Sequence, residues 1–369
     1  MAAETGICYI DGEQGVLSYR GYDINELAPN ATFEEVVYLL WEGRLPTQAE
    51  LAAFREELAE NRGLPPAAMA VLREIADKIG PMDAVRTTMS ALAAGRDDAD
   101  EATPESDRRK AVQATAQLAT IVAHYHRLRR GLPIVPPDPR LGHAANFLYM
   151  LSGERPKSAA ERALDVALIL HADHDLNAST FAARVTAATF SDYHSAIVSA
   201  IGALKGPLHG GANIGVMRML LEIDGQGVDP AEYVRRKLAA KERIMGFGHR
   251  VYKTLDPRAV HLADLSEALG EQAGERKWYE MSRKVQETVK AEKGLDANVD
   301  FFSASSYYIM GIPLDLYTPI FAISRVAGWS AHIIEQHANN RLIRPVSDYK
   351  GEHGRKWVPV EERERTLEA

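Results

Sequence analysis

Long segments rich in alanine and leucine make up much of this chain, and they limit its fold more strongly than any other feature. Apolar residues recur in them at helical spacing, and the longest segments are 82–94, 106–130, 141–151 and 158–172. The strict alternation of a strand-rich parallel sheet is absent from the sequence. These patterns predict a mainly α-helical protein.

Local signals predict where helices begin and where the chain is extended. Capping-box spacing, in which Ser or Thr is followed three residues later by Glu, occurs at 32–35, 47–50 and 158–161. The acidic and polar stretch 95–107 predicts an exposed loop, and the four prolines of 131–140 require an extended connection. We therefore expect a helix to begin at each capping box and an irregular segment in each of the other two stretches.

The first part of the chain departs from the helical pattern. Residues 9–21, YIDGEQGVLSYRG, place aromatic and β-branched residues around Asp11-Gly12, a dipeptide that favours a tight turn. We expect a small N-terminal β-hairpin here. At the other end, the charged tail beyond Arg355 predicts a segment that is mobile or that wraps a partner subunit.

Size, charge and cysteine content exclude several classes of protein. A length of 369 residues allows one large or two ordinary domains. The formal net charge of −8 gives no overall attraction to nucleic acid, so an anionic substrate has to be held by local basic residues. Cys8 is the single cysteine, and no histidine lies near it in sequence to activate it. Without a signal-peptide pattern or an apolar run of about 18 residues, the sequence predicts a cytoplasmic protein that does not span a membrane.

Two common nucleotide-binding motifs are missing. The segment GFGHRV, residues 246–251, lacks the third glycine of the dinucleotide-binding fingerprint. A phosphate loop of the form GxxxxGK[ST] does not occur either. These absences argue against a Rossmann-type dehydrogenase and against a P-loop NTPase.

The residues suited to catalysis are concentrated in the second half of the chain. Six of the twelve histidines lie between 171 and 261. They and their basic neighbours fall mainly in three segments, ILHADHDLNAS (169–179), KGPLHGGAN (205–213) and GFGHRVYKTLDPRA (246–259), and a fourth segment follows, GIPLDLYTPIFAISR (311–325).

The glycine-rich second segment carries His209. Gly and Pro on both sides prevent regular structure around it, and the following run NIGVMRMLLEI predicts a helix. The partial positive charge at a helix N-terminus disfavours a protonated imidazole, and a neutral imidazole still donates one N–H to a developing enolate. The alternative interpretation is a glycine-rich turn with an incidental histidine.

The third segment combines a histidine with an arginine. Gly246 and Gly248 free the backbone before His249, and Arg258 follows Asp256-Pro257, which resembles a helix start. A histidine and an arginine can together polarise a ketone and bind a carboxylate, because the planar guanidinium makes two parallel hydrogen bonds. The alternative is a solvated basic loop.

Asp315 in the fourth segment is a candidate general base. Thr318-Pro319 resembles an N-cap followed by proline at the first helical position, with Arg325 on that helix. An aspartate among leucines and a tyrosine would be partly desolvated, which raises its pKa toward that of a useful base. A capping or turn-forming role is the alternative.

The first segment allows a metal-site interpretation. His171 and His174 are three residues apart, so on a helix they would share a face. A catalytic zinc needs a third protein ligand, however, and no HExxH or CxxC motif is present. We therefore expect no metal, and histidines that hydrogen-bond an anionic substrate.

Taken together, these segments resemble the citrate synthase family. The similar stretches run through most of the chain in the family's order, and they are YIDGEQGVLSYRGYDI, ILHADHDLNAS, GPLHGGAN, GFGHRVYKTLDPRA, PLDLYTPIFAISRVAGW and the closing RLIRP. The resemblance implies a two-domain multihelical fold. Residues 1–212 together with 322–369 would form the large dimerisation domain and 213–321 the small domain, with the active site in the cleft between them.

The resemblance also implies roles for individual residues. The family's catalytic trio falls on His209, His249 and Asp315. Its oxaloacetate-binding group falls on His174, His249, Arg258, Arg325 and Arg344. By the same resemblance Arg344 would reach into the site of a neighbouring subunit, which implies a homodimer with an inter-subunit active site.

Some positions depart from the family pattern. Ser179 matches a family serine that hydrogen-bonds the first catalytic histidine, although the segment after His174 is one residue shorter than in some members. Arg250 and Lys253 match positions that contact CoA, and many members carry arginine in place of Lys253. The chain is also shorter than the members that carry an N-terminal regulatory extension, so we do not expect a nucleotide-regulated hexamer.

The activity implied is condensation of acetyl-CoA with oxaloacetate and water to give citrate and CoA, the entry step of the tricarboxylic acid cycle, with no cofactor. Asp315 would remove a methyl proton, His209 would stabilise the enol or enolate, and His249 with Arg258 would polarise the ketone. A 2-methylcitrate synthase that uses propionyl-CoA is the main alternative, because one methylene gives only ~1–3 kcal/mol of discrimination. A non-catalytic, ligand-sensing relative is a remote alternative, since the whole trio is present.

Overall fold

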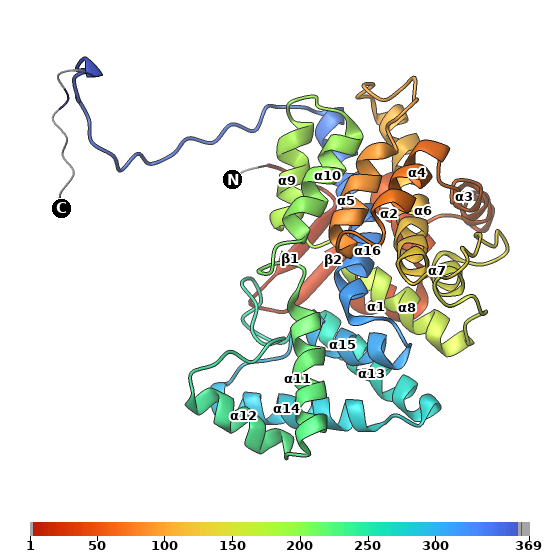
Figure 1. Cartoon of the computed structure of the whole chain (residues 1–369), viewed down its shortest axis with the longest axis vertical. Helices are drawn as coiled ribbons and strands as arrows, with labels where there is room; N and C mark the ends of the chain where they lie inside the picture. Colours follow the sequence, from red (N-terminus) through yellow and green to blue (C-terminus); the bar gives the residue numbers. More distant parts are fainter. Residues whose placement is uncertain (1–2, 361–362, 364–369) are drawn as a thin grey trace.

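The computed structural model describes residues 3–360 and residue 363, and over this part the protein is mainly helical. Figure 1 shows a larger group of helices that contains α1–α10 and α16, and a smaller group at the lower end that contains α11–α15. The predicted fold class, mainly α-helical with a small N-terminal sheet, is confirmed.

The predicted N-terminal hairpin is present and is extended by one short strand. The antiparallel sheet has the order β1-β2-β3, with β1 at Cys8–Asp11, β2 at Val16–Tyr19 and β3 at Tyr22–Asp23. Asp11 pairs with Val16 at the end of the first ladder. The Asp11 carboxylate closes the turn by accepting the backbone N–H groups of the two residues after Gly12, at 3.0 and 2.9 Å.

Five helices follow the sheet, and two of the predicted capping boxes start helices among them. The helices are α1 (Ile24–Asn30), α2 (Phe33–Glu42), α3 (Gln48–Glu60), α4 (Pro66–Ile75) and α5 (Pro81–Ala91). The side chains of Thr32 and Thr47 each accept a hydrogen bond from the backbone N–H of the glutamate three residues on. The carboxylate of that glutamate accepts the backbone N–H of the threonine in turn.

The next five helices complete the upper group, and two predictions fail there. They are α6 (Pro104–Arg129), α7 (His143–Ser152), α8 (Ser158–His171), α9 (Ala178–Ala187) and α10 (Tyr193–Leu204). The prediction of a capping box at 158–161 is wrong, because Ser158 is already the first residue of α8. The N-cap is Lys157, whose side chain makes no capping hydrogen bond. The loop at 95–107 ends earlier than predicted, because α6 begins at Pro104 and buries Asp107 against His337, 2.6 Å away.

The smaller group packs mainly on itself. Its helices are α11 (Ala212–Gln226), α12 (Pro230–Ala239), α13 (Pro257–Ala273), α14 (Lys277–Lys293) and α15 (Val299–Ile309). α13 and α11 both pack on α15, and α12 packs on α14. α13 also touches α1 and α8, so it joins this group to the larger one (Figure 1).

α16 (Tyr317–Ala338) forms the centre of the larger group and follows a short 3₁₀ helix, η1 (Leu314–Leu316). It packs on α6, α9, α2 and α8, and almost all of its length is buried. Thr318-Pro319 is not its N-cap, contrary to the sequence prediction, because the helix already begins at Tyr317. The Thr318 hydroxyl instead donates to the Gly210 carbonyl at 2.7 Å.

After α16 the chain runs as an extended, exposed arm away from the body (Figure 1). Trp357, Val346 and Tyr349 on this arm are 78%, 85% and 60% exposed. The predicted charged tail beyond Arg355 falls partly on residues outside the described part. Within the described part, no helix is both long and apolar enough to cross a bilayer.

Candidate active site

Two loops bring together the histidines of the first and third segments. His174 lies in the loop between α8 and α9, and His249 lies in the loop between α12 and α13. Their ring centroids are 5.3 Å apart. The Tyr252 ring lies 4.8 Å from His249 and its hydroxyl is 3.2 Å from Nε2 of His174. The two histidines, one from a loop of each helix group, therefore lie side by side.

The backbone fixes the tautomer of His249. Its Nδ1 atom accepts the N–H groups of Val251 at 3.1 Å and Tyr252 at 3.2 Å. Burial, followed by the charge of Arg258, lowers the pKa of His249 to about 4, so the ring is neutral at pH 7. A neutral imidazole whose Nδ1 is an acceptor carries its proton on Nε2. His249 thus presents one N–H donor to a ligand.

Arg258 is a buried cation with a fixed orientation. Asp256 caps α13 and binds Arg258 at two points, from Nε at 2.9 Å and from Nη2 at 2.8 Å. Burial opposes ionisation of Asp256, but the charge and hydrogen bonds of Arg258 outweigh it and lower the Asp256 pKa. One edge of the guanidinium, Nε with Nη2, is used in this way, which leaves Nη1 for a ligand.

Arg325 on α16 lies 1% exposed and donates from Nε to the carbonyl of His171 at 2.6 Å. Burial lowers its pKa, although Asp173 opposes the shift. Its guanidinium lies over the ring of Phe321, 4.8 Å from the centroid. With Arg258, it makes two buried cations beside the histidines. They also lower the pKa of His174, after burial, well below its usual value.

His209 lies two residues before the N-cap of α11, where the sequence predicted it. Its Nε2 atom is 2.8 Å from the hydroxyl of Ser179, on the first turn of α9, and the indole of Trp329 donates to the same oxygen at 3.1 Å. Burial, followed by Arg325, lowers the pKa of His209 to about 4. The predicted contact between Ser179 and His209 is present, and the imidazole is neutral.

Asp315 lies in η1 and is bound by an arginine that the sequence did not single out. Arg129, the last residue of α6, donates from Nη2 to Oδ1 at 2.9 Å and from Nη1 to Oδ2. Burial favours the neutral acid, but the hydrogen bonds and charge of Arg129 outweigh it, so the pKa of Asp315 is lowered. The predicted rise in this pKa was therefore wrong, because the cation comes from a helix 186 residues away in sequence.

The N-terminal sheet supports both histidine loops. The backbone N–H of Lys253 donates to the carbonyl of Gly12 at 2.8 Å. A Cβ on Gly12 would stand 2.2 Å from the carbonyl oxygen of Val251, so only glycine fits this turn. Tyr19 donates to the carbonyl of Asp173, next to His174, at 3.0 Å. The hairpin thus positions the loops of His249 and His174.

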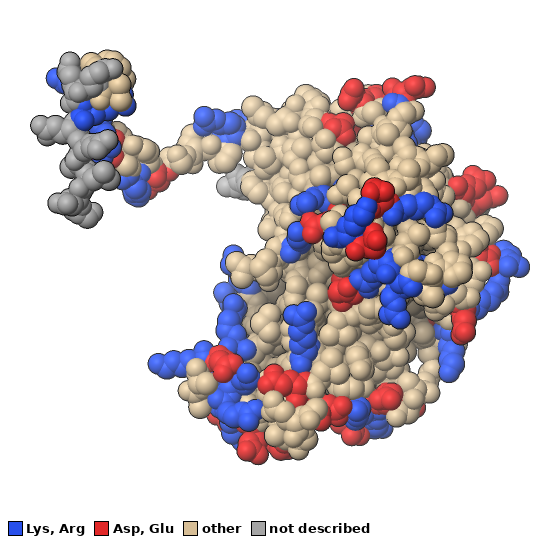
Figure 2. Space-filling view, viewed as in Figure 1, with Lys and Arg blue, Asp and Glu red and all other residues tan. Residues whose placement is uncertain are grey.

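The remaining predicted residues lie at the surface. Arg250 and Lys253 are exposed on the loop between α12 and α13, near exposed Lys241 and Arg243. Figure 2 shows Lys and Arg side chains along the edge where this loop runs. Arg344 lies on the extended arm, and among the residues that the structure describes its side chain bonds only the neighbouring Pro345 carbonyl, at 3.3 Å, so the single chain does not bring it to the histidines.

A shared helical face for His171 and His174 is excluded, because His171 is the last residue of α8 and His174 lies beyond it. Over the described residues, no group of three or more His, Cys, Asp and Glu side chains is arranged to hold a metal ion. Cys8 is buried, and burial, followed by the charge of Asp173, raises the pKa of its thiol.

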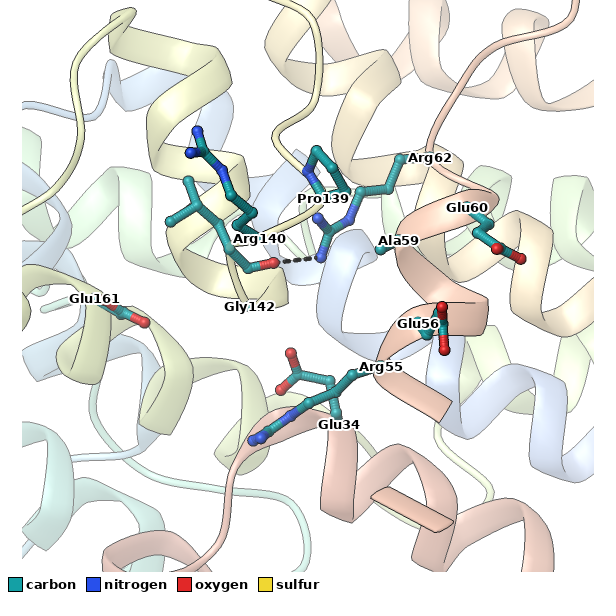
Figure 3. A pocket seen from close by; sticks show the side chains of 11 residues that line it. Glu34, Arg55, Glu56, Ala59, Glu60, Arg62, Pro139, Arg140, Gly142 and Glu161 are labelled. Atoms are coloured by element: carbon teal, nitrogen blue, oxygen red, sulfur yellow. Dashed lines mark hydrogen bonds between the residues drawn. The ribbon is translucent and has the colours of Figure 1, made fainter. Parts of the chain in front are cut away.

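A polar surface pocket of about 580 Å³ lies apart from these residues and is shown in Figure 3. Its walls come from α2, α3, α8 and the connection before α7, and none of the predicted site residues lines it. Arg62 at its rim donates to the carbonyls of Asp138 and Leu141, both at 2.8 Å, and so holds this connection in place.

Three comparisons relate the chain to known proteins. The family model described as "Citrate synthase, C-terminal domain" matches residues 1–346. A citrate synthase of Haloferax volcanii is 54% identical and is covered over 97% of its length by 98% of this chain. Citrate synthase 2 of Bacillus subtilis is 52% identical, over 94% of this chain and 93% of that protein. A 2-methylcitrate synthase of Mycobacterium tuberculosis is 44% identical, over 96% of this chain and 89% of that protein.

Solved structures agree with these relatives. The citrate synthase of Pyrobaculum aerophilum superimposes with a TM-score of 0.90 at 42% identity, covering 98% of this chain and 93% of that one. Citrate synthase of Thermoplasma acidophilum, in a ternary complex with carboxymethyl coenzyme A and oxaloacetate, also gives a TM-score of 0.90, at 36% identity, covering 98% of this chain and 97% of that one.

Proposed function

Since the chain belongs to the citrate synthase family, we propose that His209, His249 and Asp315 are its reacting groups. The enzyme condenses acetyl-CoA with oxaloacetate and water to give citrate and CoA, which is the entry step of the tricarboxylic acid cycle. The observation that carries the residue assignment is the tautomer of His249, which presents an Nε2–H donor beside two buried arginines.

The first step is removal of a methyl proton from acetyl-CoA. Asp315 is half-exposed in η1 and ionised, so it can accept this proton. His209 donates a hydrogen bond to the thioester oxygen and stabilises the charge that develops there. A neutral His209 can play this role because the neutral imidazole still carries one N–H donor.

Ser179 sets which nitrogen of His209 can donate. Asn177 Oδ1 already accepts the backbone N–H groups of Ser179 and Thr180, at 3.1 and 3.2 Å. The Ser179 hydroxyl donates to Asn177 Oδ1 at 2.8 Å and lies 2.8 Å from Nε2 of His209, to which it can turn its hydrogen because Asn177 Oδ1 keeps its two backbone donors. The imidazole proton then lies on Nδ1, free to donate to the thioester.

The second step is attack on the ketone of oxaloacetate. His249 donates from Nε2 to the ketone oxygen, and Arg258 adds positive charge beside it. The enol carbon forms the new carbon–carbon bond, and water then hydrolyses the citryl-CoA thioester. Each positioned acid or base is worth on the order of 10²–10⁴ in rate.

Oxaloacetate binding uses the buried cations. Its two carboxylates match Arg258 and Arg325, which are 2% and 1% exposed, with His174 as a further donor. We assign Arg344 of a second subunit to the same site, because the exposed arm that carries it makes little contact with its own chain. The enzyme would then be a homodimer with a shared active site, and Arg250 and Lys253 would meet the CoA phosphates.

The proposed domain division places the site in a cleft. The proposed small domain, residues 213–321, holds nearly all of α11–α15, and the remainder forms the large domain. The boundary at 321 falls within α16, whose greater part lies in the large domain, and the grouping of helices in Figure 1 supports this division. His209 and Asp315 lie at the two crossings between the groups, and His249 lies within the smaller one. Closure of the groups on oxaloacetate would align the trio and exclude water. We propose the cytoplasm as the location, which is the expectation from the sequence.

A thiol-release assay with oxaloacetate tests this assignment. We expect CoA release from acetyl-CoA that depends on oxaloacetate and is unaffected by metal chelators. The competing substrate is propionyl-CoA, because relatives named 2-methylcitrate synthase reach 42–44% identity. A preference for acetyl-CoA in kcat/KM of about 10- to 200-fold is the range that one methylene allows. A reversed preference would assign the chain to 2-methylcitrate synthesis.

A further inference from the structure

Arg129 and Asp315 form a two-point ion pair between the end of α6 and the turn of η1. Both carboxylate oxygens are used, Oδ1 by Nη2 at 2.9 Å and Oδ2 by Nη1. The Arg129 side chain is 17% exposed while that of Asp315 is 50% exposed. The aspartate is therefore open to solvent while the arginine that holds it is mostly covered by protein.

Arg129 is itself held in place by its own helix. Its guanidinium lies over the Tyr125 ring, 5.1 Å from the centroid, and its Nη2 is 3.1 Å from Nδ1 of His126. Burial, followed by the charge of Arg129, lowers the pKa of His126 to about 4, so this ring is neutral and Nδ1 accepts. Tyr125 in turn donates to the carbonyl of Ile79 at 2.7 Å. The cation is thus oriented before any substrate arrives.

We propose that Arg129 is the positioning residue of the catalytic base: it holds the Asp315 carboxylate in one orientation through a two-point ion pair. The proposal rests on the assigned role of Asp315. Each oxygen of a paired carboxylate uses one lone pair on the guanidinium and keeps another for the substrate proton. A bidentate pair also stops rotation of the carboxylate, and a displacement of about 1 Å can cost 10²-fold in rate.

The same ion pair fixes the orientation of the Asp315 carboxylate and lowers its basicity. These two effects of Arg129 on catalysis have opposite signs. The charged and titratable groups around Asp315 are Arg129, His126 and Tyr125, all on α6. Arg129 dominates among them because it alone is cationic and in contact. Its removal should raise the Asp315 pKa toward its usual value and free the carboxylate to rotate. We expect the loss of orientation to outweigh the gain in basicity.

The test compares Arg129→Gln and Arg129→Lys with a control, Arg130→Gln. The control removes the same charge from an exposed neighbouring residue. We expect Arg129→Gln to lower kcat at least ~10-fold, with oxaloacetate affinity by calorimetry unchanged and the acid limb of kcat/KM for acetyl-CoA moved to higher pH. Arg129→Lys should restore part of kcat and return the acid limb toward that of the parent. Arg130→Gln should behave like the parent.

A double variant separates a positioning role from a general structural one. In an Asp315→Asn background, Arg129→Gln should lower kcat little further, because the carboxylate that Arg129 positions is already gone. A full additional loss there, or an acid limb that does not move in Arg129→Gln, would overturn the proposal. If Asp315→Asn alone kept near-parental turnover, the base assignment itself would fall. If Asp315→Asn is inactive but Arg129→Gln does not show the predicted changes, only the role of Arg129 is overturned.

Discussion

The Nε2 atom of His209 lies 2.8 Å from the hydroxyl oxygen of Ser179, which also receives the indole N–H of Trp329. Ser179 is completely buried, so this contact is shielded from water. The hydroxyl is therefore placed to choose the tautomer of the histidine that we assign to the thioester.

Replacement of Ser179 by alanine should weaken catalysis without weakening oxaloacetate binding. One neutral hydrogen bond is worth about 0.5–1.5 kcal/mol, so we expect kcat to fall roughly 2- to 10-fold. Steady-state kinetics and oxaloacetate calorimetry measure the two effects. Ser199→Ala removes a hydroxyl from the neighbouring α10 and serves as the control. An unchanged kcat in Ser179→Ala would remove Ser179 from the mechanism.

Asp315→Asn should leave the fold intact and remove the base. We expect a loss in kcat of at least ~10², the lower end for a general base. Oxaloacetate affinity should change little, because Arg258 and Arg325 remain. Asp97→Asn, at an exposed position, is the charge-matched control. Near-normal turnover in Asp315→Asn would show that another group takes the proton.

Arg344→Ala should weaken oxaloacetate binding without breaking the dimer. If Arg344 acts across the interface, mixing Arg344→Ala subunits with His249→Ala subunits should rescue activity. With equal amounts of the two variants, random assembly makes about half of the dimers mixed, and each mixed dimer has one intact site of two. Roughly a quarter of the parental activity is therefore expected. The measurement is turnover after denaturation and joint refolding, with mixed dimers verified by differential tags. Mixed dimers without activity would place both residues in one chain's site.

Oxaloacetate should tighten the binding of CoA. The two buried arginines and Arg344 bind its carboxylates from different bodies, and a ligand shifts an equilibrium by its difference in affinity for the two states. Calorimetry of a CoA analogue with and without oxaloacetate measures the coupling, which must be equal in the reverse order of addition. Independent binding of the two ligands would rule out closure as the source of ordered binding.

His143 should make the protein less stable in acid. Burial, followed by the charge of Arg62, lowers its pKa to about 3, against 6.5 for an unperturbed histidine. Between these values the unfolded state binds one more proton, so this contribution to stability is present above pH 6.5 and is lost as the pH falls. His143→Phe should reduce the slope of unfolding free energy against pH by up to about 1.4 kcal/mol per unit.

The measurement is urea unfolding at several pH values between 4 and 7, the range in which the folded and unfolded states differ in bound protons. His353→Gln, which removes an exposed histidine from the arm, is the control and should leave the slope unchanged. A parental slope in His143→Phe would show that His143 is not kept neutral by the fold. The phenylalanine can fill the same space beside Phe33, whose ring is 5.2 Å away.

The sequence by itself determined the helical class and most of the local structure. The helices over 82–94, 106–130, 141–151 and 158–172 were all predicted close to their bounds, because helical periodicity and capping act over about four residues. The N-terminal hairpin could also be predicted, because its turn signal is local in the sequence. The motifs also named His209, His249 and Asp315, whose neighbours in sequence are glycine, proline and basic residues.

Only the tertiary structure decided how these groups are tuned. The contact of Tyr252 with His174 spans 78 residues, and that of Arg129 with Asp315 spans 186. No local pattern encodes either pair, since each depends on where two helix groups pack against one another. The sequence suggested a desolvated Asp315 with a raised pKa, whereas a guanidinium from a distant helix lowers it, because an adjacent charge outweighs partial burial.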